Sequence, residues 1–181
     1  MVKFTDLITR KFQNIAGSRY EEILKAYEEF FLTEEEMVIP DIKSILIPLD
    51  RYTTTVPDEV YETISAYPNA RLQLVYMIDE NVCRLIKDTL GEEDAKKFRE
   101  KEERRAREIL SRMRDRIREL GIIWAEDTVF GDKSEYVESI AGEYDMLIIS
   151  KHYGSETAKT HTVSPVVFRI VQYVGRPVVL Y

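Results

Sequence analysis

Three short apolar runs, separated by long polar segments, restrict the fold of this chain more than any other feature of its sequence. They are SILIPLD at residues 44–50, YDMLIIS at 144–150 and RPVVLY at 176–181. Each run is too short for a helix and lacks the strict alternation of a half-exposed strand. Such runs are typical of strands that are buried on both faces, which occur in parallel sheets. The sequence therefore predicts a parallel sheet whose functional residues lie at the carboxyl ends of its strands.

Helix-length segments separate the predicted strands along the chain. Strands are expected at residues 44–49, 72–78, 122–130, 146–149 and 178–181. Helices are expected after Pro57, over a long region that ends at Leu120, after a cap at Asp132, and at residues 166–173. This alternation requires right-handed crossovers between parallel strands. We predict an α/β fold with a doubly wound, Rossmann-like sheet of five parallel strands.

The first forty residues precede this pattern and have a different character. Apolar residues recur there at helical spacing on both sides of Gly17, which predicts two helices. We therefore divide the chain into an N-terminal helical extension, residues 1–40, and an α/β domain, residues 41–181. The four phenylalanines of the extension favour its burial, since exposed they would form an unusually apolar patch. The sequence leaves open whether its own domain, a twin subunit or another protein covers the extension.

Composition and charge narrow the function classes. The net charge is −7, so the chain would on average repel a polyanion, and we expect no nucleic-acid partner. A single cysteine, Cys83, excludes an intramolecular disulfide and fits a reducing compartment. No apolar stretch approaches the roughly 20 residues that span a bilayer, and no signal-peptide core follows Met1. We expect a cytoplasmic protein without a membrane span.

Four motifs, in order, resemble the universal stress protein family. They are ILIPLD at residues 45–50, FGDKSEYVESIA at 130–141, DMLIIS at 145–150 and SPVVFRIVQYVGRPVVLY at 164–181. Each motif is weak alone, and the resemblance rests on their common order and spacing from about residue 42 to the end. The resemblance implies a five-stranded sheet of order 3-2-1-4-5.

In one branch of that family, an adenine-nucleotide site uses a loop of the form G-x2-G-x9-G-[ST] after the fourth strand. Glycines in such a loop let backbone N–H groups curl around phosphate without an obstructing Cβ. Counted back from Pro177, the four motif positions hold Lys151, Gly154, Ser164 and Pro165. Counted forward from Asp145, they hold Ser150, Tyr153, Val163 and Ser164. At most one glycine survives in either frame, so the resemblance implies a degenerate loop with a weak or altered site for ATP or AMP, with Mg²⁺ if ATP binds.

The resemblance also assigns residues to the base and the phosphates. Asp50 would contact the base or ribose, while Pro48 and Val75 would line the adenine pocket; a turn aspartate and two core residues are the alternatives. Cationic groups near the phosphate position could compensate for the missing glycines, although a solvated loop with ordinary charged residues is the favoured interpretation. These cations are Lys151, His152, Lys159, His161 and Arg169. The candidate nucleotide-binding residues are Pro48, Asp50, Val75, Ser150, Lys151, His152, Gly154, Ser164 and Pro165.

Other chemistry finds little support in the sequence. His152 and His161 lack the cysteine or glutamate partners of a metal site, so we expect no metal. No G-x-S-x-G, H-E-x-x-H or Walker motif is present. A phosphoacceptor domain would need an acidic pair after its first strand, but Arg51 follows Asp50. Only Asp50 and the histidines could act as a base, and we expect no enzymatic activity.

Two functions remain open. The first is a non-catalytic stress-response or signalling protein with a weak or altered adenine-nucleotide site. The second is a nucleotide-independent interaction module whose N-terminal helices dock a protein partner or extend a dimer. In both cases the last strand would leave a sticky edge, so we expect a homodimer through Val178, Val179 and Leu180.

Overall fold

A computed structural model describes residues 41–155 and 162–181, which belong to the α/β unit Asp41–Tyr181. The strands of this unit form one five-stranded sheet in the order β3-β2-β1-β4-β5, and every neighbouring pair is parallel. They are β1 (Ser44–Leu49), β2 (Arg71–Asp79), β3 (Trp124–Gly131), β4 (Met146–Ile149) and β5 (Val178–Leu180). The predicted fold class and strand order are confirmed.

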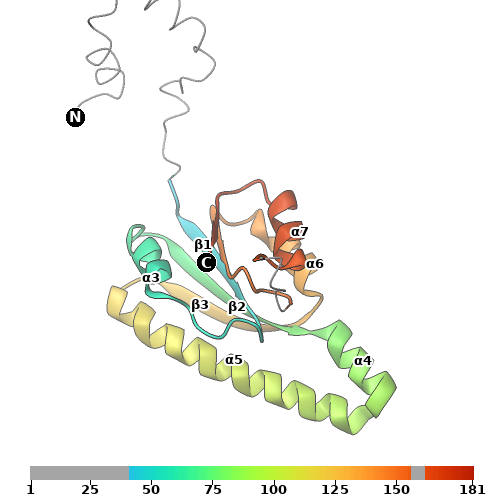
Figure 1. The fold of residues 1–181 in the computed structure, drawn as a ribbon. Coiled ribbons are helices and arrows are strands. Elements are labelled where there is room, and N and C mark those ends of the chain that lie inside the picture. Colours follow the sequence, from blue (N-terminus) through green and yellow to red (C-terminus); the bar gives the residue numbers. More distant parts are fainter. Residues whose placement is uncertain (1–40, 156–161) are drawn as a thin grey trace, which may run out of the picture. The chain divides into compact units, whose positions relative to one another are not determined.

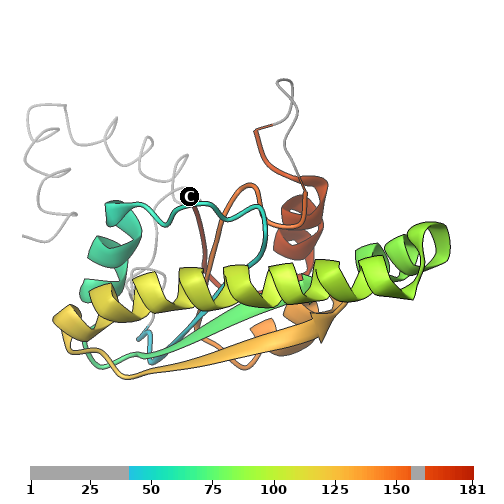
Figure 2. The same ribbon diagram turned by 90° about the horizontal axis from the view of Figure 1, so that it is seen from below.

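Helices cover both faces of the sheet (Figure 1). They are α3 (Asp58–Ser65), α4 (Glu80–Leu90), α5 (Glu92–Leu120), α6 (Lys133–Ala141) and α7 (Pro165–Tyr173). One face packs against α3 and α5, and the opposite face packs against α6 and α7. Helix α5 lies below β1, β2 and β3 in Figure 1, and Figure 2, seen from below, shows it running along the sheet in front of the strands. The result is three layers, as expected for a doubly wound sheet.

The central strands are buried on both faces, as their unbroken apolar runs predict. In β1, Ile45 and Ile47 belong to the core under α3 and α5, while Leu46 belongs to the core under α6 and α7. All four residues of β4 are buried as well. In contrast, β5 pairs only with β4 and is half-exposed, with Leu180 exposed at the sheet edge. The prediction of a strand buried on both faces is wrong for this last run, because no sixth strand follows it in the described chain.

Side-chain caps lie at the first turns of α4, α6 and α7, which follow β2, β3 and the loop after β4. Asp79 accepts hydrogen bonds from the first N–H groups of α4, and Asp132 does the same for α6. Ser164 caps α7, whose first residue is Pro165. These residues satisfy backbone donors that have no partner inside the helix. The caps therefore fix where each chain segment turns at the carboxyl edge of the sheet.

The long helical region differs from its predicted form in two respects. It is divided into α4 and α5 at Gly91, whose φ of 101° lies in a region that residues with a Cβ rarely adopt. Helical spacing predicts that the buried face of this region is formed by Phe98, Ala106, Ile109, Leu110, Met113, Ile117 and Leu120. The residues from Ala106 to Ile117 are buried as predicted, but Phe98 is only half-buried and Leu120 is exposed. The third strand begins at Trp124, two residues later than predicted. These differences lie at element ends, where backbone conformation and tertiary contacts decide the boundary.

Two further expectations concern the N-terminal extension and membrane spans. The predicted extension, residues 1–40, lies outside the described residues and stays a prediction. Within residues 41–155 and 162–181, no helix has the length and apolar character needed to cross a bilayer.

Candidate functional site

The site is centred on Asp50, which directly follows β1 at the carboxyl edge of the sheet. Its side chain is completely buried. Oδ1 accepts a hydrogen bond from the Tyr52 N–H at 3.0 Å, and the Asp50 carbonyl accepts one from the Thr53 N–H at 3.0 Å. These bonds form the turn by which the chain leaves the sheet, as expected for an aspartate in a turn.

Lys133 neutralises the buried Asp50 carboxylate. Lys133 is the first residue of α6 and is only 5% exposed. Its Nζ donates to Asp50 Oδ2 at 2.8 Å and lies 3.7 Å from Oδ2 of Asp79 at the end of β2. A buried charge is strongly unfavourable unless it is paired and hydrogen-bonded. One ammonium group thus links the ends of β1 and β2 to the start of α6.

Gly154 supplies the second donor to Asp50. Its N–H donates to Asp50 Oδ2 at 2.8 Å, so that one oxygen accepts from both Gly154 and Lys133. Gly154 has a φ of 87°, and a Cβ there would lie 2.6 Å from each methyl carbon of Val166. The backbone conformation and the close approach of α7 both require a residue without a Cβ. Gly154 therefore allows the loop after β4 to close over Asp50.

The two serines of the candidate site also bond within the protein. Ser150 Oγ accepts from the His152 N–H at 3.2 Å. Ser164 Oγ accepts from the Val167 N–H at 3.1 Å and donates to the carbonyl of Tyr153. Both serines are buried, at 4% and 0% exposure. Their hydroxyls hold the loop after β4 and the start of α7 in place.

Backbone hydrogen bonds join the two ends of the same loop. The Ser164 N–H donates to the Lys151 carbonyl at 2.8 Å, and the Lys151 N–H donates to the Tyr181 carbonyl at 2.8 Å. The described parts of the loop after β4 are thereby anchored to α7 and to the last residue of the chain.

Burial and neighbouring groups shift the pKa values of two side chains near Asp50. Burial raises the pKa of Tyr153 well above its ordinary value, and the nearby carboxylates of Asp50 and Asp79 raise it further. The Tyr153 hydroxyl donates to the Lys133 carbonyl at 3.2 Å and stays protonated. The backbone N–H of Glu135 is the main cause of a lowered pKa at Asp132, which caps α6 next to Lys133. The Tyr153 ring is thus enclosed in a low-dielectric cluster.

The sequence-predicted residues fall into three groups in the structure. Asp50, Gly154 and Ser164 lie together around the closed loop. Pro48 and Val75 are buried register partners in β1 and β2. Lys151 and Pro165 are exposed, Ser150 is buried, and His152 is half-buried.

The cations expected near the phosphates can be placed only in part. Arg169 pairs with Glu138 of α6 at 2.9 Å. Lys159 and His161 lie outside the described residues. Among the described residues, no group of three or more His, Cys, Asp or Glu side chains is arranged to hold a metal ion.

Sequence reasoning missed Lys133, Asp79 and Tyr153. Lys133 carries one detectable signal, because a cation at the first position of a helix opposes the positive end of the helix dipole. Such a placement, directly after the Asp132 cap, indicates an acidic partner elsewhere in the fold. That partner could not be identified, since Asp50 lies 83 residues away in the sequence.

Chemically, the Asp50 carboxylate is a hydrogen-bond acceptor whose two oxygens already bind donors of the protein. Asp50 Oδ2 accepts from two donors, and Oδ1 accepts from the Tyr52 N–H at 3.0 Å and from the Thr53 hydroxyl at 3.4 Å. A ligand that donates to Asp50 would have to replace the Lys133 ammonium or the Gly154 N–H.

Comparison with known proteins identifies the architecture. No family model and no curated protein sequence matches this chain. Solved structures do match. Hypothetical protein MJ0577, the subject of a structure-based assignment of biochemical function, superposes with a TM-score of 0.64 at 20% identity over 78% of this chain and 96% of that chain. A universal stress protein family member from Burkholderia pseudomallei gives 0.52 at 23% identity, over 80% of this chain and 98% of that chain.

A third structure agrees with these two. The universal stress protein UspA from Lactobacillus plantarum superposes with a TM-score of 0.53 at 14% identity, over 78% of this chain and 99% of that chain. The matched structures are covered almost completely. The chain therefore has the fold of the universal stress proteins, as its motifs predict.

Proposed function

We propose that this chain is a cytoplasmic universal stress protein, a non-catalytic stress-response or signalling protein whose altered adenine-nucleotide site binds ATP or AMP weakly. The observation that carries the proposal is the engagement of Asp50, whose Oδ2 accepts from Lys133 Nζ and from the Gly154 N–H, both at 2.8 Å. The shared fold supports the assignment to stress proteins, and the degenerate loop supports the altered site.

Weak binding follows from competition inside the protein. A nucleotide that hydrogen-bonds to Asp50 must first break one of its buried contacts. Displaced from Asp50, the Lys133 ammonium would keep the more distant Asp79 carboxylate and the face of the Tyr52 ring, which are weaker partners. The fraction of molecules with an open Asp50 is therefore small, and the apparent affinity falls by that fraction.

Calorimetric titration of the nucleotide-stripped full-length protein with ATP, ADP and AMP, with and without Mg²⁺, tests the proposal. We expect saturable binding with Kd of about 0.1–1 mM, because most of the binding energy offsets the opening of the site. Asp50→Ala should abolish the binding heat. Asp88→Ala, which removes an exposed carboxylate of α4, should leave it unchanged.

Two results would overturn parts of the proposal. Micromolar binding would show that Asp50 is readily accessible and that the site is not altered. No heat and no thermal stabilisation at millimolar nucleotide would remove the nucleotide and leave the interaction-module alternative.

A homodimer through β5 is the second part of the proposed function. Val178 and Val179 are half-buried and Leu180 is 44% exposed on a strand that pairs with β4 alone. On the preceding helix α7, Phe168 and Tyr173 are 61% and 71% exposed. An apolar edge strand presents unpaired N–H and C=O groups to a second copy, and a two-fold pairing of these edges would cover it.

A further inference from the structure

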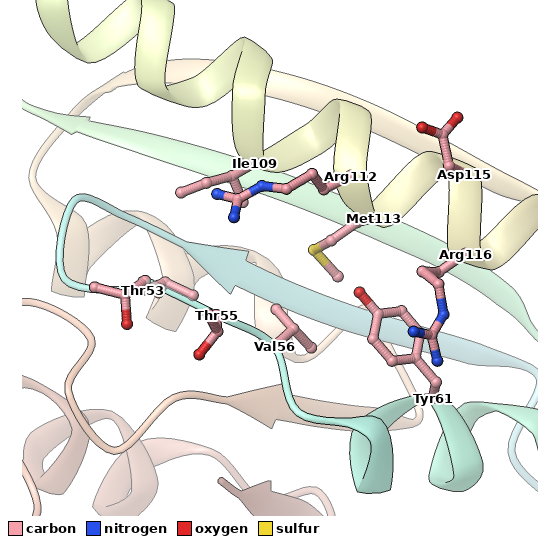
Figure 3. Close-up of a pocket in the computed structure, with 10 residues that line it drawn as sticks. Thr53, Thr55, Val56, Tyr61, Ile109, Arg112, Met113, Asp115 and Arg116 are labelled. Carbon is pink, nitrogen blue, oxygen red and sulfur yellow. The ribbon is translucent and has the colours of Figure 1, made fainter.

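A cavity of about 360 Å³ lies between α5 and the chain segment that joins β1 to α3 (Figure 3). This segment, residues 51–57, contains no helix or strand. It runs beside α5 as an extended chain, and the cavity lies between the two near Ile109 and Met113 (Figure 3). The volume lies in the range of small-molecule sites. Thr53, which hydrogen-bonds to Asp50, lines this cavity, whereas Asp50, Lys133 and Gly154 do not.

One side of the cavity is apolar. Ile109 and Met113 of α5 are buried members of the core, and Val56 packs against the same core from the extended segment. Apolar walls of this kind favour the aromatic or aliphatic body of a ligand, because its contact removes apolar surface from water.

The same helix also carries a cation that has no acidic partner among the described residues. Arg112 lines the cavity, and its Nε donates to the Glu108 carbonyl at 3.4 Å. Its two terminal nitrogens have no acceptor among the described residues. Figure 3 shows the guanidinium directed toward the extended segment, whereas the Asp115 carboxylate points away from the cavity. The planar guanidinium matches a carboxylate or phosphate, which accepts two parallel hydrogen bonds.

Tyr61 adds a buried donor. Its side chain is 8% exposed, and its hydroxyl points into the cavity (Figure 3) without a hydrogen-bond partner in the described chain. Arg116, which also lines the cavity, lies over the Tyr61 ring at 4.9 Å and pairs with Asp58 at 2.7 Å. The Tyr61 hydroxyl is therefore available to donate a hydrogen bond to a ligand in the cavity.

We propose that this cavity binds a small organic anion, with its carboxylate or phosphate on Arg112, a hydrogen bond from Tyr61 and its apolar body against Val56, Ile109 and Met113. The ligand site is distinct from the proposed nucleotide site. It does not depend on that site being able to open.

Titration of the full-length protein, followed by NMR of the methionine and isoleucine methyl groups, tests this site. Phenylacetate and phenyl phosphate are the anionic probes, and phenylacetamide is the neutral isostere. We expect the anions to shift the Met113 and Ile109 methyl signals with Kd of about 1 mM or tighter. Phenylacetamide should bind at least about tenfold more weakly, because charge-assisted hydrogen bonds are the stronger ones.

Substitutions on the two polar residues sharpen the test. Arg112→Gln should weaken binding of both anions about tenfold and remove the preference over the amide. Tyr61→Phe, which keeps the ring and its packing, should weaken binding severalfold. Arg107→Gln, on an exposed residue of the same helix outside this cavity, is the matched control and should not change Kd.

Three results would overturn the inference. They are the absence of methyl shifts at 10 mM of either anion, equal affinity for anion and amide, and unchanged Kd in the Arg112→Gln variant.

Discussion

At the scale of single residues, the Lys133–Asp50 ion pair keeps Asp50 engaged inside the protein. Both side chains are almost fully buried, and their contact joins the ends of elements that are distant in the sequence. Most ion pairs in the described chain lie on the surface, where solvent screens them. The buried pair differs because removal of one partner leaves the other charge in a low-dielectric environment.

Lys133→Met should lower the free energy of unfolding by about 3–5 kcal/mol, because Asp50 loses its neutralising partner. Asp50→Asn combined with Lys133→Met should recover a large part of that loss, since no unpaired charge remains on either residue. Urea unfolding monitored by circular dichroism measures both effects. Arg84→Met, which breaks an exposed pair with Glu80, should cost less than about 1 kcal/mol. A Lys133→Met cost as small as that of Arg84→Met would contradict the role assigned to the buried pair.

Asp145 provides a pH-dependent test at the opposite end of the sheet. Its Oδ2 accepts from the N–H groups of Lys43 and Ser44, and the Lys43 bond is the main cause of its lowered pKa. A lowered folded-state pKa contributes stability that is present above the ordinary value near 3.8 and is lost as the pH falls. Asp145→Asn should therefore be less stable than wild type at pH 7, and the difference should shrink below about pH 4. Equal differences in midpoint at pH 7 and pH 2.5 would exclude this origin.

At the scale of elements, the loop after β4 and helix α7 are fitted to each other through Gly154. The positive φ of Gly154 turns its N–H toward Asp50, and the absent Cβ admits Val166. The same glycine is thus needed by the conformation of one element and the packing of another.

Gly154→Ala should destabilise the protein by about 1–3 kcal/mol, because it adds backbone strain and a collision with Val166. Gly175→Ala is the matched control, since a Cβ there meets no atom within 4 Å. Thermal unfolding of the two variants under identical conditions makes the comparison. If the Gly154 variant were as stable as the Gly175 variant, α7 would not be constrained by this contact.

At the scale of the whole molecule, the two edge strands of the sheet, β3 and β5, differ in the character of their exposed residues. β3 alternates between half-buried and exposed residues and carries charged side chains, which suit a solvated edge. β5 carries only apolar residues and has no such protection. This asymmetry is the physical basis of the proposed homodimer.

Leu180→Lys should convert a dimer at tens of micromolar into a monomer, because a lysine on the edge opposes strand pairing. Sedimentation velocity measures the change. Leu85→Lys, on an exposed leucine of α4, should leave the association state unchanged. A wild-type chain that sediments as a monomer, or a Leu180→Lys variant that stays dimeric, would refute the proposed interface.

The sequence by itself determined the fold class. Unbroken apolar runs must be buried on both faces, and helix-length spacers between them provide the crossovers of a parallel sheet. It also indicated Asp50 and the helix cap Asp132, since these depend on neighbouring residues. Only the tertiary structure decided that Asp50 is closed by Lys133 and Gly154, because those contacts span 83 and 104 residues. The cavity beside Arg112 was equally hidden, since it exists only where the extended segment runs beside α5. Local signals act over a few residues, whereas charge pairing and cavities depend on which distant surfaces the fold brings together.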